Sequence, residues 1–199
     1  MNFFKPKASD FTFKQLANSD ITISEVFIDS DEYEICEDFS HKMWANKKKG
    51  FYGRGMINNE DDPRRVERTG ILGEMSVAKL LDLPINVTYM EGGDQQDFVI
   101  NGKRADVKTA TRNYGALLIR ASYNGNTADL IKLDKDIYVS AFIIEENRQD
   151  KFAKLGVVGY IDYNNLTENY LKPARFRNAS HWNWDIPYKD LVPIQHLRG

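Results

Sequence analysis

The chain has little of what marks secreted or membrane-spanning proteins. Its 199 residues include one cysteine, Cys36, so an internal disulfide is impossible and a buried, reduced thiol is expected. No apolar run reaches the roughly 18 residues that a membrane-spanning helix needs. The first residues, Met-Asn-Phe-Phe-Lys-Pro-Lys, lack the apolar core of a signal peptide. These absences favour a cytoplasmic protein without membrane contact.

Histidine and excess positive charge are also lacking. The three histidines, His41, His181 and His196, have no ligand spacing, which argues against a zinc site. Basic and acidic residues nearly balance, and the net charge of −2 does not by itself indicate nucleic-acid binding. We find no glycine-rich phosphate loop and no Ser-His-Asp pattern. With 42% hydrophobic residues, the chain can nevertheless bury a real core.

The spacing of apolar residues predicts two helices followed mainly by strands. Residues 31–48 have Cys36, Phe39 and Met43 at helical spacing, and a second helix begins at Asp62-Pro63 and stops before Pro84. Strands are predicted over 21–28, 85–90, 97–100, 103–109, 116–121, 137–144 and 155–161. This order predicts an α/β fold with a central mixed sheet flanked by helices. Residues 1–60 would be an N-terminal extension of the same compact unit, and 61–199 the main domain.

The pair Asn101-Gly102 lies between two runs of strand-forming residues. Asn-Gly is the strongest short signal for a two-residue hairpin turn, because both central residues need positive φ. A turn here places Asp97 opposite Asp106, and side-chain alternation puts both on one face with Lys108. The other face carries apolar residues that we assign to the core: Phe98, Ile100, Ala105 and Val107.

The opposed aspartates are a candidate cation site. Directly facing residues lie about 5 Å apart at Cβ, where two carboxylates repel each other. A divalent cation between them turns repulsion into binding, and oxygen ligands suit Mg²⁺, with Mn²⁺ as a substitute. Glu74 lies on the apolar stripe of the second helix, where a carboxylate is costly unless it is paired or metal-bound. If that helix packs near the hairpin, Glu74 reaches the same cluster.

These residues resemble the PD-(D/E)xK nuclease superfamily, which has the restriction-endonuclease-like fold. The resemblance covers about residues 63–144 and rests on Glu74 and on the run Asp97-Phe-Val-Ile-Asn-Gly-Lys-Arg-Ala-Asp106-Val-Lys108-Thr. In that family the first aspartate lies at a strand end and the (D/E)xK triplet on the next strand. Asp97 therefore matches the first acid, and Asp106 and Lys108 the triplet. There are two departures: Gln96 stands where the motif name has proline, and Asp106 replaces the commoner glutamate.

The resemblance implies Mg²⁺-dependent hydrolysis of phosphodiester bonds, with DNA as the expected substrate and RNA still open. Asp97 and Asp106, with Glu74, would hold the metal. Lys108 would position the attacking water or offset the charge of the transition state. A homodimer is compatible with this family. Five basic residues are candidates for contacts with nucleic-acid phosphates: Lys48, Lys49, Arg54, Arg68 and Arg112.

Other interpretations stay open. Asp97 and Asp106 can be strand-end residues on a solvated face, with Lys108 simply neutralising Asp106. Glu74 can be the structural partner of an arginine such as Arg68 or Arg104. At the level of the whole protein, the alternatives are a catalytically inactive nucleic-acid-binding module on the same fold and a structural or assembly protein.

Overall fold

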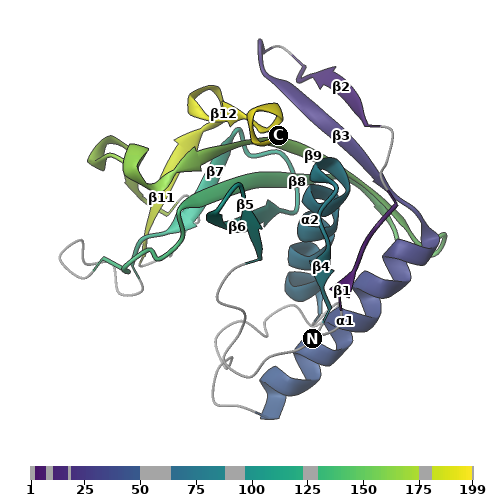
Figure 1. Ribbon diagram of the computed structural model, residues 1–199. Helices are drawn as coiled ribbons and strands as arrows, with labels where there is room; N and C mark the ends of the chain where they lie inside the picture. Colours follow the sequence, from purple (N-terminus) through teal and green to yellow (C-terminus); the bar gives the residue numbers. More distant parts are fainter. Residues whose placement is uncertain are drawn as a thin grey trace.

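The computed structural model describes residues 3–7, 11–17, 19–49, 64–87, 97–122, 130–174 and 181–198, without the side chains of 46–49. Its centre is a mixed sheet, shown in Figure 1. In spatial order the strands are β2 (Thr12–Gln15), β3 (Thr22–Ile28), β9 (Phe152–Asp162), β8 (Ile137–Asn147), β6 (Lys103–Ala110) and β5 (Phe98–Ile100). A short strand, β12 (Val192–Pro193), pairs with β9. β6 and β8 are parallel and the other neighbours antiparallel, so the α/β class and the mixed sheet are confirmed.

Two helices lie together on one face of this sheet (Figure 1). α1 (Ser30–Lys49) begins with a reciprocal cap, in which the Glu32 N–H donates to Asp29 and the Asp29 N–H donates to Glu32. α2 (Arg65–Leu81) ends at Asp82, whose φ of 55° is left-handed. The residues expected to start α2, Asp62 and Pro63, lie outside the described residues. No helix in the described ranges is both long and apolar enough to cross a bilayer.

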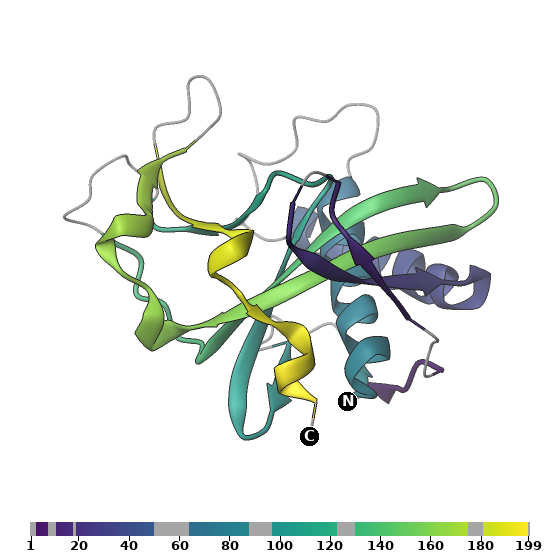
Figure 2. The same cartoon turned by 90° about the horizontal axis from the view of Figure 1, so that it is seen from above.

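A second, smaller sheet covers the opposite face. It consists of β10 (Leu171–Pro173), β11 (Trp182–Pro187) and β7 (Ala116–Arg120), all antiparallel. From above, the yellow-green strands of this region lie away from the helices (Figure 2). The expectation of a sheet flanked by helices is therefore wrong for this face. The chain between β6 and β8 forms β7, because Leu117 and Ile119 bury one side of a strand that pairs with β11.

Side-chain alternation divides the core between the two faces. Along β8, Ile137 and Val139 point toward the helices, whereas Tyr138 and Phe142 point toward the small sheet. Both sets are buried. A strand that is covered on both faces has a nearly continuous run of apolar residues, and residues 137–144 form such a run.

The remaining short elements lie at the edges. β1 (Phe3–Phe4) pairs with β4 (Ile85–Asn86), which is the described part of the strand expected over 85–90. Four 3₁₀ turns follow β9: Tyr163–Asn165, Glu168–Tyr170, Tyr188–Asp190 and Ile194–Leu197. β3, from the first 60 residues, pairs directly with β9 in the central sheet.

Two ion pairs join the helices to each other and to the sheet. Lys79 on α2 and Glu32 on α1 are 2.5 Å apart, and their side chains are 5% and 3% exposed. Arg68 on α2 donates to Glu146 on β8 at 2.6 Å, and the Tyr33 hydroxyl donates to the same carboxylate at 2.7 Å. Removing one partner of such a pair costs about 3–5 kcal/mol, because the other charge stays buried. The ion pairs therefore specify how α1 and α2 are placed.

α2 approaches the sheet most closely at Gly73. A Cβ built at Gly73 would overlap the side chain of Thr109 on β6, whereas one at Gly70 meets no atom within 4 Å. The absence of a side chain at Gly73 thus allows the close contact between α2 and β6.

We predict opposite effects of alanine at these two glycines. Gly73→Ala should lower the free energy of unfolding by about 1–3 kcal/mol, because the new methyl group forces helix and strand apart. Gly70→Ala in the same helix should raise it by about 0.5–1 kcal/mol, because alanine is the better helix former. Urea denaturation followed by circular dichroism measures both. If Gly73→Ala were as stable as Gly70→Ala, the close approach would be refuted.

Candidate functional site

The hairpin has the predicted register. Phe98 pairs with Ala105, Val99 with Arg104 and Ile100 with Lys103. The turn residues Asn101 and Gly102 have φ values of 51° and 77°, as this turn requires. The four side chains assigned to the core are all buried: Phe98, Ile100, Ala105 and Val107.

Asp97 directly precedes β5 and is bonded to β6 on either side of Asp106. Its backbone N–H donates to the carbonyl of Ala105 at 3.0 Å, and Oδ2 of its carboxylate accepts from the N–H of Val107 at 2.6 Å. The side chain thus supplies an acceptor where β5 no longer provides a backbone carbonyl. This contact holds the Asp97 carboxylate against β6, at the level of Asp106.

Asp106 and Lys108 lie on the face of β6 that points away from α2. Their neighbours Ala105 and Val107 pack in the core beneath the helices, and alternation directs Asp106 and Lys108 to the other side. Lys108 Nζ is 2.5 Å from Asp106 Oδ2, and the two side chains are 40% and 18% exposed. A partly exposed ion pair of this kind contributes about 0–1 kcal/mol, so another cation or an anion can replace either partner at small cost.

Tyr138 is a neighbour of this site that sequence analysis missed. It lies beside Asp106 in the parallel pairing of β6 and β8 and is buried. Burial raises the pKa of Tyr138 to about 12, and the carboxylates of Asp106 and Asp134 add to the effect. Its hydroxyl therefore stays protonated at neutral pH. The sequence offers no signal for this contact, because the pairing joins residues 32 positions apart through a crossover.

Glu74, the third residue expected at the metal site, is on α2. It is half-buried and near Cys36 of α1, whose thiol pKa is raised well above its usual value by burial and, secondarily, by the charges of Glu74 and Glu32. Among the described residues, no three histidine, cysteine or acidic side chains lie close enough together to hold a metal ion. Asp97 and Asp106 are therefore the two candidate metal ligands at the hairpin, and the role of Glu74 as a third ligand stays a prediction.

Two carboxylates still match the chemistry of Mg²⁺. This ion keeps several waters and commonly binds through one or two carboxylates together with substrate phosphates. Asp97 is bonded to the backbone of Ala105 and Val107, the two neighbours of Asp106, and Lys108 is paired with Asp106. The donor set therefore fits a two-carboxylate magnesium site.

Arg68 and Arg104, the two arginines expected as possible partners of Glu74, each form an ion pair with another carboxylate. Arg68 is 2% exposed and bonded to Glu146, so its burial removes it from the surface where substrate phosphates would bind. Arg104 pairs with Asp136. The side chains of Lys48 and Lys49, and all of Arg54, lie outside the described residues, and their nucleic-acid contacts stay predictions.

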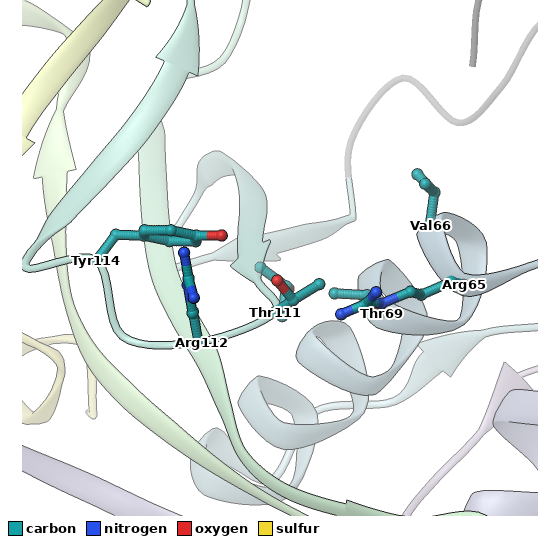
Figure 3. A pocket seen from close by; sticks show the side chains of 7 residues that line it. Arg65, Val66, Thr69, Thr111, Arg112 and Tyr114 are labelled. Carbon is teal, nitrogen blue, oxygen red and sulfur yellow. The ribbon is translucent and has the colours of Figure 1, made fainter. Parts of the chain in front are cut away.

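Arg112 lies at a cavity of about 500 Å³ between α2 and the segment after β6 (Figure 3). We call this cavity the arginine pocket. Its lining residues are Arg65, Val66, Thr69, Thr109, Thr111, Arg112 and Tyr114. The Arg112 guanidinium lies 5.0 Å from the centre of the Tyr114 ring. The sequence gives no signal for this pocket, because Arg65 at the start of α2 and Arg112 after β6 are far apart in the chain.

Substitutions of Asp97 can separate its structural from its chemical role. In the absence of divalent ions, Asp97→Ala should lower the free energy of unfolding by about 1–2 kcal/mol, because the Val107 N–H loses its acceptor. Asp97→Asn keeps an oxygen acceptor and removes the charge facing Asp106. It should therefore be as stable as the wild type or slightly more so, as measured by urea denaturation with EDTA. An equal loss in both variants would contradict this account of the Asp97 carboxylate.

Comparison of the chain with protein-family models, curated proteins and solved structures found no match in any of the three.

Proposed function

We propose that this protein is a metal-dependent nuclease of the PD-(D/E)xK type that hydrolyses phosphodiester bonds, with DNA as substrate. The observation that supports the proposal is the β5–β6 hairpin, in which Asp97 is bonded to the backbone of Ala105 and Val107, the two neighbours of Asp106, and Lys108 is paired with Asp106. A helix, α2, precedes the hairpin, and the central strand β8 pairs with β6. We infer a restriction-endonuclease-like core from this order, with β7 in the crossover as a variation.

The charges of the site suit this chemistry. Lys108 neutralises Asp106, a role that a divalent cation would take over. Asp97 and Asp106 would hold the metal, and Glu74 would join them directly or through water after a change of its side-chain position. When bound, Mg²⁺ polarises a phosphoryl oxygen and lowers the pKa of a coordinated water. The fixed bond from the Val107 N–H orients one oxygen of Asp97 and limits how its carboxylate can turn.

Lys108 is the group that acts on the substrate. The Lys108 side chain is 40% exposed, so an arriving phosphate can reach it. With Asp106 engaged as a metal ligand, the Lys108 ammonium would be able to donate hydrogen bonds to the attacking water or to a phosphate oxygen. The Lys108 ammonium would then place positive charge close to the atoms that gain negative charge in the transition state.

A second candidate is a nucleic-acid-binding module that has lost cleavage. The absence of a three-ligand group among the described residues and the neutralisation of Asp106 by Lys108 favour it. The two candidates differ in whether divalent ions bind and whether bonds are broken, which the next two experiments measure.

We expect Mg²⁺- or Mn²⁺-dependent cleavage on a panel of single- and double-stranded DNA and RNA. Asp106→Asn and Lys108→Ala should each reduce the rate at least about 100-fold, because each removes charge stabilisation of the transition state. A matched control exists on β8 and β9, where Lys154 is 38% exposed and pairs with Glu145 at 2.8 Å. Lys154→Ala and Glu145→Gln should cleave like the wild type.

Cleavage that persists in folded Asp106→Asn and Lys108→Ala would refute this assignment of the site. If only these two variants lose activity while the Lys154 and Glu145 variants keep it, a general effect of surface charge is excluded. Circular dichroism of every variant checks that the fold is intact.

Metal binding should also appear as added stability. A ligand at 100 times its Kd raises the free energy of unfolding by about 2.7 kcal/mol. Mg²⁺ or Mn²⁺ should therefore raise the Tm of the wild type and leave that of Asp106→Asn unchanged, as measured by differential scanning fluorimetry. Asp150→Asn, in the exposed turn after β8, is the control that should keep the metal response. A wild type without any response would favour the binding module over the enzyme.

A further inference from the structure

The arginine pocket combines groups that bind an oxyanion. Arg65 is the first residue of α2, Arg112 follows β6, and both side chains are exposed. Neither has a carboxylate partner within the described part of the chain, and the described lining contains no acidic residue. The start of α2 adds the positive end of a helix dipole. We propose that this pocket binds an internal phosphate of a nucleic-acid backbone, an inference that rests on the proposed function.

Threonines complete the pocket. Thr69 is 6% exposed, lines the cavity from α2, and its hydroxyl makes no hydrogen bond among the described residues. Thr111 lines the facing wall, also without such a partner (Figure 3). Thr109 also lines the cavity, and its Oγ1 is buried without a hydrogen-bond partner among the described residues. Such a hydroxyl is costly to bury and is satisfied when a ligand oxygen approaches. The two arginines and these hydroxyls thus supply both charge and hydrogen-bond donors to one cavity.

The position of the pocket suits a strand that also reaches the proposed nuclease site. Thr109 directly follows Lys108 on β6, and their side chains point to opposite faces. From Asp106 to Ala110, β6 pairs with β8 along one edge, and on the other edge the Val107 N–H donates to Asp97. Beyond Val107, at Lys108 and Thr109, this second edge has no strand partner among the described residues. A nucleic-acid backbone crossing this edge meets Lys108 on one face and the arginine pocket on the other.

An internal nucleotide explains more of the pocket than a free anion does. The cavity, at about 500 Å³, is in the range of sites that bind whole small molecules. Arg112 is held over the Tyr114 ring, which orders its guanidinium and adds a flat surface against which a base or sugar can pack. The phosphate would lie between Arg65 and Arg112, with its nucleoside on the Arg112–Tyr114 side.

Binding without metal tests the pocket separately from cleavage. Anisotropy of fluorescent oligonucleotides, single- and double-stranded, is measured in EDTA over a range of salt concentrations. Arg65→Gln and Arg112→Gln should each weaken binding about tenfold. Each should also reduce the slope of log K against log salt by about 0.7–0.9, the value for one lost phosphate contact. Arg148→Gln, in the exposed turn after β8, makes the same charge change and should have no effect.

The source of the phosphate is tested with two oligonucleotides of one sequence, with and without a 5′-phosphate. Equal affinity supports an internal phosphate, whereas binding that requires the 5′-phosphate, or that millimolar inorganic phosphate abolishes, would overturn it.

The inference also fails if the wild type binds no oligonucleotide, or if the Arg65 and Arg112 variants keep the affinity and the salt slope of the wild type. In that last case the nuclease proposal still stands if Lys108-dependent cleavage is seen. Weakened binding without any cleavage supports the pocket and removes the nuclease.

Discussion

The two-residue turn at Asn101-Gly102 is the constraint on which the rest of this architecture depends. Its positive φ values set which residue of β5 faces which residue of β6. A slip of one residue would turn the charged side of β6 toward α2 and the apolar side toward the small sheet. The register therefore decides at once where the helix packs and where Asp106 and Lys108 become accessible.

The packing of the two helices fixes the position of the hairpin residues in the fold. Gly73 lets α2 approach Thr109, and the buried pair of Glu32 and Lys79 holds α1 on α2. Arg68 ties the same helix to β8 through Glu146. Because buried charges tolerate only one arrangement of partners, these contacts define the position of α2 more narrowly than apolar packing alone would. The start of α2 is thereby placed against the end of β6, where the arginine pocket lies.

Charge in this protein is separated locally although it nearly cancels in total. The net charge is −2, yet Asp106 and the bonded Asp97 lie at the middle of β6, whereas the end of the same strand leads to a pocket with two arginines. A cation at the aspartates and phosphates at Lys108 and the arginines would balance both regions. The overall charge of the chain is a poor guide to local charge here, because the acidic residues at the hairpin and the arginines of the pocket offset each other in the sum.

The sequence by itself determined the local features: the helix ending before Pro84, the hairpin turn, and the alternation that separates Asp106 and Lys108 from Ala105 and Val107. These follow from backbone preferences and side-chain period, which act between near neighbours. Only the tertiary structure decided that β7 joins a second sheet, that Tyr138 lies beside Asp106, that Glu74 lies near Cys36, and that Arg65 and Arg112 line one pocket. Each of these contacts joins distant segments, and its partner is chosen by the packing of whole elements rather than by the residues next to it in the chain.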